Sequence, residues 1–355
     1  MRLVVTGGSG FIGSNFIHTM FHLRGEISCP DLRKHELEIS KEELEILNID
    51  NLTYASDERN LSGIGEIEGY NFLEIDIANR AAVERAFEEF RPEYVVHFAA
   101  ESHVDRSIES GDIFVRTNVL GTQVLLDVSR NYGVKKFVHV STDEVYGSIE
   151  VGSFTEEDKI VASSPYSASK AGSDLLALAH HITYDFPVVI TRCTNNYGPR
   201  QHKEKLLPKI IEMAGDGQEI PIFGDGLNVR DWLYVKDHCL AILRVLEEGE
   251  PGSVWNIAGR DEKTNLEVVE CVLSSVGAPT DLFKFVNDRP GHDVRYAIDT
   301  RRIKDELGWR PSVTLEMGLE KTVQWYLDNQ VWWQPLLERA GVGERLGIEY
   351  DIGLR

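Results

Sequence analysis

The sequence contains little cysteine, and this scarcity excludes two classes of protein. Only four of the 355 residues are cysteines, Cys29, Cys193, Cys239 and Cys271. They are widely spaced and form no CxxC pair, so we expect neither a disulfide-stapled secreted domain nor a metal centre. Reduced, buried thiols in a cytoplasmic protein are the interpretation that this spacing favours.

Long apolar runs are also absent. No stretch approaches the about 18 uninterrupted apolar residues that a membrane-spanning helix needs. The first residues, Met1 to Gly7, enter a strand-like run directly and lack the apolar stretch of a signal peptide. The sequence therefore predicts no membrane partner.

Positive charge is in deficit, with 37 Lys and Arg against 58 Asp and Glu and a formal net charge of -21. Such a surface repels nucleic acid and anionic membranes, so neither is an expected partner. A ligand that carries phosphates would need local arginines, lysines or helix N-termini to overcome this field.

Short apolar segments alternate with helical patterns through the first half of the chain. Strands are predicted at 3–6, 45–49, 72–75, 94–98, 136–141 and 187–191. The first predicted helix ends near residue 23, and three further helices cover 81–90, 113–132 and 166–184. Buried strands that alternate with helices form parallel sheets with right-handed crossovers. The predicted fold class is therefore α/β, with a doubly wound parallel Rossmann sheet.

Turn signals become frequent after Cys193. They predict a smaller mixed α/β C-terminal lobe that binds the substrate. We assign 1–192 to the Rossmann domain, with later strands of its sheet from about 229–260, near Leu233 and Trp255. Residues 193–228 and 261–355 form the predicted lobe. The charged segment from Gly25 to Glu43 is interpreted as a solvated excursion, although a partner-binding role for it stays open.

A glycine-rich turn follows the first strand and opens the first helix. Gly7, Gly10 and Gly13 fit a GxxGxxG pattern, and Gly8 adds a GxGxxG reading. Glycine lets the backbone N–H groups approach a pyrophosphate, which then faces the positive end of the helix. The strand–turn–helix context makes a dinucleotide site the preferred interpretation.

Acidic residues end the next two strands. Asp50 is placed to bind the adenosine ribose, although the charged excursion puts it 37 residues after Gly13. A carboxylate there favours NAD over NADP, because it repels a 2′-phosphate. Asp76 and Ile77 are expected near the adenine.

A Tyr-x-x-x-Lys pattern occurs in the helix after the fifth strand. Tyr166 and Lys170 are four residues apart and share one helix face. An ammonium group nearby would lower the pKa of the phenol, so that Tyr166 could act as a base.

These patterns together resemble the extended short-chain dehydrogenases, and within them the dTDP-glucose 4,6-dehydratases. The matching segments span nearly the whole chain: 7–15, 50–54, 99–107, 141–147, 166–172, 195–199, 229–238 and 289–299. The resemblance implies a tightly bound NAD that is regenerated in each turnover. Its expected contacts are Gly7, Gly10, Phe11, Ile12, Gly13, Asp50, Asp76, Ile77, Ala99, Tyr166 and Lys170.

The segment Ser141 to Gly147 discriminates best within this group, because it contains the adjacent acids Asp143 and Glu144. The family pattern implies that Asp143 is the acid, Glu144 is the base and Thr142 binds the reacting sugar hydroxyl. The implied reaction oxidises C4 of the sugar, removes water across C5 and C6 and returns the hydride to C6. The product is a 4-keto-6-deoxy sugar.

The substrate site is expected beyond the carboxyl ends of the strands. For His103, which is one of the positions given next, a second interpretation is a packed loop histidine with no contact to the substrate. The positions that the resemblance implies are Ser102, His103, Asn195, Glu204, Lys205, Leu206, Arg230, Asn265, Arg289, His292 and Tyr296.

Several alternatives stay open. A 4,6-dehydratase could act on a UDP- or GDP-linked sugar, and a 4-epimerase or decarboxylase on this fold would need Tyr166 and Lys170 but not the acid pair. A non-enzymatic NAD-binding sensor would typically lose the Tyr-Lys pair. The helices from about Ile113 and from Tyr166 resemble those that pair across a two-fold axis, so a homodimer is expected.

Overall fold

The computed structural model describes residues 1–27, 44–288 and 293–332. Within these ranges no helix is long and apolar enough to cross a membrane. Most of the segment from Gly25 to Glu43 lies outside the described residues, so its predicted role stays open.

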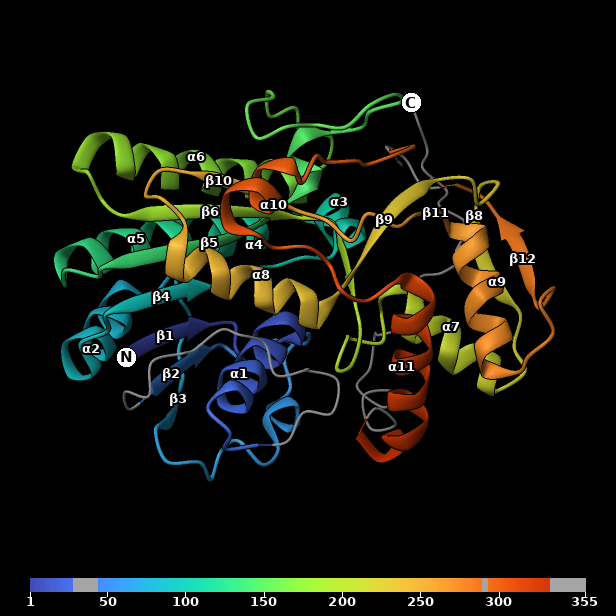
Figure 1. The fold of residues 1–355 in the computed structure, drawn as a ribbon, viewed down its shortest axis with the longest axis horizontal. Helices are drawn as coiled ribbons and strands as arrows, with labels where there is room; N and C mark the ends of the chain where they lie inside the picture. The colour runs from blue at the N-terminus through green and yellow to red at the C-terminus, as the bar shows by residue number, and fades with distance from the viewer. Residues whose placement is uncertain (28–43, 289–292, 333–355) are drawn as a thin grey trace.

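A seven-stranded parallel sheet forms the middle layer of the larger part of the molecule, on the left in Figure 1. Its strand order is β10-β6-β5-β4-β1-β2-β3. The strands are β1 (Arg2–Thr6), β2 (Glu45–Asp50), β3 (Tyr70–Glu74), β4 (Tyr94–His97), β5 (Lys136–Thr142), β6 (Val188–Cys193) and β10 (Val254–Ile257). All neighbouring strands in it are parallel. The fold class predicted from the sequence is confirmed.

Helices cover both faces of this sheet, which explains why its central strands are apolar on both sides. One face packs against α1 (Phe11–Leu23), α8 (Val235–Glu248) and α10 (Arg301–Leu307), through residues such as Phe16 and Ile242. The other face packs against α2 (Arg80–Phe90), α5 (Thr122–Asn131) and α6 (Pro165–Tyr184), through residues such as Phe87 and Leu125. Because all seven strands are parallel, their carboxyl ends lie at the same edge of the sheet.

The helix predicted over 113–132 consists of several pieces. After α3 (Val104–Glu109), α4 (Asp112–Phe114) continues into η2 (Val115–Gly121), a seven-residue π-helix, and then into α5. The wider turn presents Asn118, which is 1% exposed. Its Nδ2 donates to Glu101 O at 3.0 Å and to Ser169 Oγ at 2.8 Å. A polar residue inside the helical layer thus links the loop after β4 to α6.

The remaining elements form the smaller part of the molecule around a separate core that includes Tyr197, Trp232 and Leu319. Its sheets are β11 (Glu262–Thr264), β9 (Val229–Tyr234) and β7 (Asn195–Tyr197), and β12 (Phe283–Val286) with β8 (Ile220–Phe223). Its helices are α7 (Leu206–Gly215), α9 (Asn265–Val276) and α11 (Leu315–Asp328), while the short η1 (Glu58–Leu61) and η3 (Asp143–Tyr146) belong to loops of the main sheet.

One strand assignment was wrong. The strand near Trp255 does join the main sheet as β10, beside β6. The strand near Leu233, in contrast, is β9, which pairs with β7 and β11 in the three-stranded sheet. Its apolar pattern indicated a buried strand but could not indicate which partner it would pair with. The domain boundaries drawn from the sequence stay a prediction.

Candidate active site

A cavity of about 320 Å³ opens at the carboxyl ends of the central strands. Its walls come from the glycine-rich turn, the ends of β2, β4, β5 and β6, and the first turns of α6. Ligands bind at this edge in doubly wound sheets, where the strand order reverses. The cavity is therefore the candidate active site.

The glycine-rich turn is closely packed on one side and open on the other. Gly7 has a φ of 71°, and a Cβ on it would lie 2.6 Å from Ala99 N. A Cβ on Gly13 would lie 2.3 Å from Gly7 O, whereas a Cβ on Gly10 would meet only Gly7 O, at 3.3 Å. No side chain caps the N-terminus of α1 at Gly10. The first N–H groups of this helix, at Phe11 and beyond, fit a phosphate from the cavity side.

Asp50 ends β2 at the cavity, 5% exposed. Its carboxylate accepts hydrogen bonds from Ser9 N at 3.0 Å, Leu52 N at 2.9 Å and Ser56 Oγ at 2.8 Å. Burial raises the pKa of Asp50, and these hydrogen bonds oppose the shift. The residue is thus held rigidly at the place where a ribose would lie in this fold.

Asp76 and Ile77 also line the cavity, after β3. The Asp76 carboxylate is fixed by Ala78 N at 2.8 Å and by the Arg116 guanidinium at 2.5 Å. Ala99 lines the same wall. All the residues predicted to contact the cofactor therefore border one cavity, and the shape and the uncapped helix end fit a dinucleotide.

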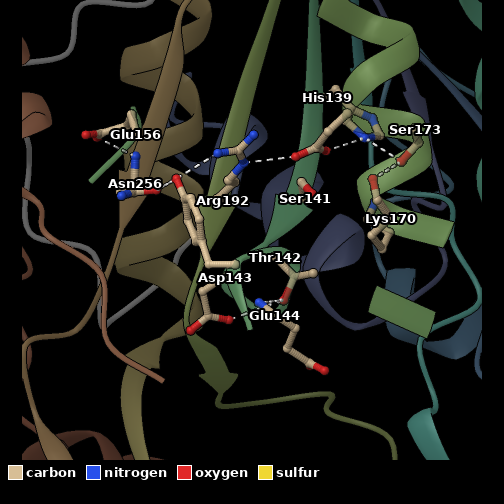
Figure 2. Close-up of polar contacts among 12 residues, drawn as sticks. His139, Ser141, Thr142, Asp143, Glu144, Glu156, Lys170, Ser173, Arg192 and Asn256 are labelled. Carbon is tan, nitrogen blue, oxygen red and sulfur yellow. Dashed lines mark hydrogen bonds and ion pairs between the residues drawn. The ribbon is translucent and has the colours of Figure 1, made fainter. Parts of the chain in front are cut away.

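The acid pair lies on the short helix η3, directly after β5. The Thr142 hydroxyl donates to Asp143 Oδ1 and accepts from Glu144 N, both at 3.3 Å (Figure 2). Asp143 is 3% exposed, and its Oδ2 has no hydrogen-bond partner among the described residues. Burial raises the pKa of Asp143 well above its ordinary value, and the nearby charges of Glu144 and Asp231 add to this effect. The Asp143 side chain is therefore suited to hold a proton.

Tyr166 and Lys170 come from the first turns of α6, and both line the cavity. Pro165 starts this helix, and a reciprocal capping box joins Ser164 and Ser167. The Tyr166 backbone N–H is held by Ser107 Oγ at 3.1 Å, and the Lys170 ammonium donates to Val140 O at 2.8 Å. The positions of Tyr166 and Lys170 are thus fixed by the capped start of α6 and by these hydrogen bonds.

The ionisation of Tyr166 differs from the sequence prediction. Burial raises the pKa of this phenol well above its ordinary value, and the charge of Glu144 raises it further, while a hydrogen bond with Thr142 lowers it. Burial also lowers the pKa of Lys170 to about 8. The prediction that Lys170 lowers the pKa of Tyr166 was wrong for this structure, because burial and the neighbouring carboxylate dominate.

Only some of the predicted substrate residues line the cavity, namely Ser102, Asn195, Glu204 and Lys205. The Lys205 ammonium donates to Ser102 O at 3.1 Å. His103 lies behind this wall, where its ring caps α3 and lies 3.7 Å from the Glu204 carboxylate. Both readings of His103 thus remain compatible with its position.

Four other predicted residues do not line the cavity: Leu206, Arg230, Asn265 and Tyr296. Leu206 packs against the smaller core, and Asn265 begins α9. The Arg230 guanidinium lies 4.5 Å from the centre of the Tyr296 ring, and both residues interact electrostatically with the acid pair. Arg289 and His292 lie outside the described residues.

Several residues at or directly beside the cavity had not been singled out from the sequence, and Asn118 and Cys193 are two of them. Asn118 lies within an apolar helical pattern, and the only sequence signal for it is a single amide residue in that pattern. Its burial, at 1% exposure, is visible only in the structure. Cys193 ends β6 and lines the cavity, and burial raises the pKa of its thiol to about 12. Among the described residues, no cluster of side chains could hold a metal ion.

The chain is similar to known nucleotide-sugar enzymes over most of its length. A family model described as GDP-mannose 4,6 dehydratase matches residues 4–322. A probable dTDP-glucose 4,6-dehydratase of Sinorhizobium fredii is 46% identical, over 98% of this chain and 99% of that protein. A dTDP-glucose 4,6-dehydratase of Streptomyces niveus is 47% identical, over 95% of this chain and 96% of that protein.

Solved structures show the same similarity. The dTDP-glucose 4,6-dehydratase DesIV of Streptomyces venezuelae, crystallised with NAD and TYD bound, superposes with a TM-score of 0.87 at 45% identity. The comparison covers 95% of this chain and all of that one. A UDP-glucose 4-epimerase of Thermotoga maritima, solved with UDP-glucose, gives a TM-score of 0.81 at 30% identity, over 93% of this chain and 100% of that one.

Proposed function

This chain belongs to the nucleotide-sugar 4,6-dehydratase family, and we propose that it converts dTDP-glucose into dTDP-4-keto-6-deoxyglucose with NAD as its cofactor. The observation that carries this proposal is the pairing of buried Asp143 with the less buried Glu144 in the cavity that also contains Tyr166. Elimination of water needs an acid and a base at once, and two carboxyl groups in unequal surroundings can supply them.

NAD, when bound, supplies the hydride acceptor and the hydride donor of this internal redox reaction. The glycine turn and the N-terminus of α1 would hold its pyrophosphate, and Asp50 its adenosine ribose. Asp76, Ile77 and Ala99 would border the adenine end. No external oxidant is needed, so each turnover leaves the cofactor as it began.

Tyr166 would take the proton of the sugar C4 hydroxyl during oxidation. Its raised pKa makes the ionised phenol scarce near neutral pH but a strong base once formed. Lys170, whose ammonium is fixed on Val140 O, would provide positive charge one helical turn away. Thr142, which hydrogen-bonds Tyr166, would orient the reacting hydroxyl.

Asp143 and Glu144 would perform the elimination. Once C4 is a ketone, the proton on C5 is acidic, and Glu144 would remove it. Asp143, whose pKa burial raises, would give its proton to the C6 hydroxyl, which leaves as water. Reduction of C6 and return of a proton to C5 complete the product.

The remaining sugar-nucleotide contacts stay proposals. Ser102, Asn195, Glu204 and Lys205 line the cavity and would bind the sugar and diphosphate. Arg230 and Tyr296 lie beside the acid pair. The planar guanidinium of Arg230 would donate two hydrogen bonds to the diphosphate. His103, Leu206, Asn265, Arg289 and His292 complete the set proposed from the family pattern.

We also propose that the protein is a homodimer in the cytoplasm. Apolar side chains are exposed on two adjacent helical segments: Ile113, Val115 and Leu120 on α4 and η2, and Leu175 and Ile182 on α6. A two-fold pairing of these helices would bury them. The described cysteines are free thiols, which suits a reducing compartment.

The proposal can be tested by incubating the purified protein with dTDP-glucose, without added NAD, and following the sugar nucleotide by mass spectrometry. Loss of one water with no net NADH would support both the reaction and the resident cofactor. Conversion of UDP-glucose or GDP-mannose instead would keep the mechanism and change the substrate. No turnover of any sugar nucleotide, even with added NAD, would contradict the proposal and favour a sensor.

A further inference from the structure

Five buried polar side chains that do not line the cavity form a connected network. Figure 2 shows the polar contacts in this region. Asp174 Oδ1 lies 3.3 Å from His139 Nε2, and Asp174 Oδ2 accepts from Arg192 Nε at 2.9 Å. Arg192 Nη1 then donates to Tyr146 Oη at 2.7 Å, and Tyr146 Oη donates to Asn256 Oδ1 at 2.9 Å. The roles proposed above for the acid pair and the Tyr-Lys pair use none of these five side chains.

The ion pair at the centre of this network is fully enclosed. Asp174 is 0% exposed and Arg192 is 2% exposed. Burial lowers the pKa of His139 to about 4, so His139 is neutral near neutral pH and Arg192 is the cation that hydrogen-bonds the Asp174 carboxylate. Enclosed ion pairs add little net stability, because desolvation offsets their attraction, and some are retained for the geometry that they impose.

Two members of this network, Asp174 and Tyr146, lie on the elements that carry the proposed chemistry. Asp174 lies one helical turn after Lys170 on α6, and the intervening Ser173 Oγ donates to Lys170 O at 2.7 Å. Tyr146 is the last residue of η3, which begins at Asp143. The network therefore spans from the helix of the Tyr-Lys pair to the turn of the acid pair.

Tyr146 is held on several sides at once. Its ring stacks on Phe154 with centroids 5.2 Å apart and planes 14° apart, and the Arg192 guanidinium lies 4.7 Å from its centre. Its hydroxyl accepts from Arg192 and donates to Asn256, so both of its hydrogen-bonding roles are used. Burial raises its pKa to about 12, which keeps it a phenol.

We propose that Tyr146 and Arg192 are positioning residues for the elimination step, which hold the Asp143–Glu144 turn in register with α6. This inference rests on the proposed dehydration of a nucleotide sugar. The acid pair sits on a four-residue turn, and its proton transfers require placement to within about 0.5 Å. Tyr166 and Lys170 sit on a 20-residue helix, so they depend less on this contact.

Tyr146→Phe tests the idea with little change in packing, because the stacked ring stays and only the hydroxyl is lost. In single turnovers with dTDP-glucose, the rate of oxidation at C4 can be measured from the absorbance of NADH. We expect this rate to change less than about 3-fold. The rate of elimination, measured by mass spectrometry, should fall by about 10- to 100-fold. Bound NADH should therefore accumulate, and deuterium at C5 should produce a larger isotope effect on kcat.

Arg192→Lys provides a second variant that keeps the charge beside Asp174. Lysine is a point charge without the planar fork, so it cannot reach Asp174 and Tyr146 together as arginine does. The double variant should lose little more than the worse single variant, because both act through one contact. Tyr326→Phe is the matched control: it removes a buried tyrosine hydroxyl that donates to Gln201 O and takes no part in the network.

Amide hydrogen exchange provides a readout that is independent of activity. Gly147 N–H donates to Glu144 O at 3.3 Å, and Val161 N–H donates to Val145 O at 2.9 Å. Both amides should exchange faster in Tyr146→Phe and not in Tyr326→Phe. Equal slowing of both half-reactions, or unchanged exchange, would overturn the positioning role. If the unaltered protein does not dehydrate dTDP-glucose, the proposed function fails, and the exchange comparison still decides whether Tyr146 holds the turn.

Discussion

Asp143 and Glu144 are neighbours in the chain, yet Asp143 is 3% exposed while Glu144 retains partial exposure. The difference arises because η3 turns Asp143 inward beneath the Thr142 hydroxyl. Burial and the charge of Glu144 both raise the pKa of Asp143. Two chemically similar carboxyl groups are thereby separated into a proton donor and a proton acceptor.

Asp143→Asn should retain its fold and lose the elimination step. The amide can still accept from Thr142 but cannot donate a proton to a leaving hydroxyl, so kcat should fall about 10²- to 10⁴-fold. Product formation from dTDP-glucose, followed by mass spectrometry, measures this. Asp158→Asn, in an exposed loop, is the control. Activity within a few-fold of the unaltered protein would contradict the acid role of Asp143.

The same variant should alter how stability depends on pH. The folded pKa of Asp143 lies above its ordinary value of 3.8, so its contribution to stability is full below that value and is lost as pH rises through the folded pKa. Asparagine removes this loss. The Tm of Asp143→Asn minus that of the unaltered protein should therefore increase as the pH rises above 3.8. A difference that stays constant or decreases would mean that Asp143 ionises readily in the folded state.

Gly13→Ala and Gly10→Ala should fail in different ways. A Cβ at Gly13 would lie 2.3 Å from Gly7 O, so this variant should lose about 1–3 kcal/mol of unfolding free energy. A Cβ at Gly10 meets only Gly7 O, at 3.3 Å, so Gly10→Ala without NAD should have about the Tm of the unaltered protein without NAD, but should retain less NAD through purification. Tm and cofactor content of both variants decide this. Full NAD content in Gly10→Ala would contradict the proposed pyrophosphate site.

Tyr166→Phe should abolish the first proton transfer without unfolding the protein. The ring would keep its contact with Phe114, whose centroid is 6.3 Å away, and only the hydroxyl would be lost. Turnover should fall about 10²- to 10⁴-fold. Because the pKa of Tyr166 is raised, oxidation by the unaltered enzyme should accelerate with increasing pH. Tyr184→Phe, half exposed at the end of α6, should match the unaltered enzyme.

Charges introduced on the outer face of α6 should separate the proposed dimer. Leu175 is 58% exposed and Ile182 is 80% exposed, so glutamate at both positions should fold yet disfavour apolar pairing. Light scattering should then report a monomer, whereas Val151→Glu, which is 87% exposed in a loop, should not change the mass. A dimer that persists in the double variant would place the interface elsewhere.

The parts of the fold that depend on local pattern could be predicted from the sequence. The Gly7–Gly13 turn, the ends of the central strands and the start of α6 each have a local signature, and the structure brings them to one cavity. Secondary-structure periods and turn chemistry act over a few residues, so they can be read directly.

The remaining features depend on contacts between distant segments. The pairing of β9 with β7 instead of the main sheet depends on which strand edges are available, and no local pattern records that. Arg192 and Asp174 lie on different elements, and their pairing emerges only when β6 packs beside α6. The raised pKa of Tyr166 likewise depends on enclosure by the folded protein.

The π-helix Val115–Gly121 has a consequence for how this chain can change in evolution. A π-helical turn can be regarded as one residue inserted into an α-helix. The wider turns absorb this residue locally, so the residues on either side keep the phase of an uninterrupted α-helix. Deleting one residue within Val115–Gly121 would therefore leave the apolar face of α5, with Leu125, against the sheet. The loss would fall on the wider turn itself, which presents Asn118 to Glu101 and Ser169, so the extra residue serves the polar link to α6 and not the packing of α5.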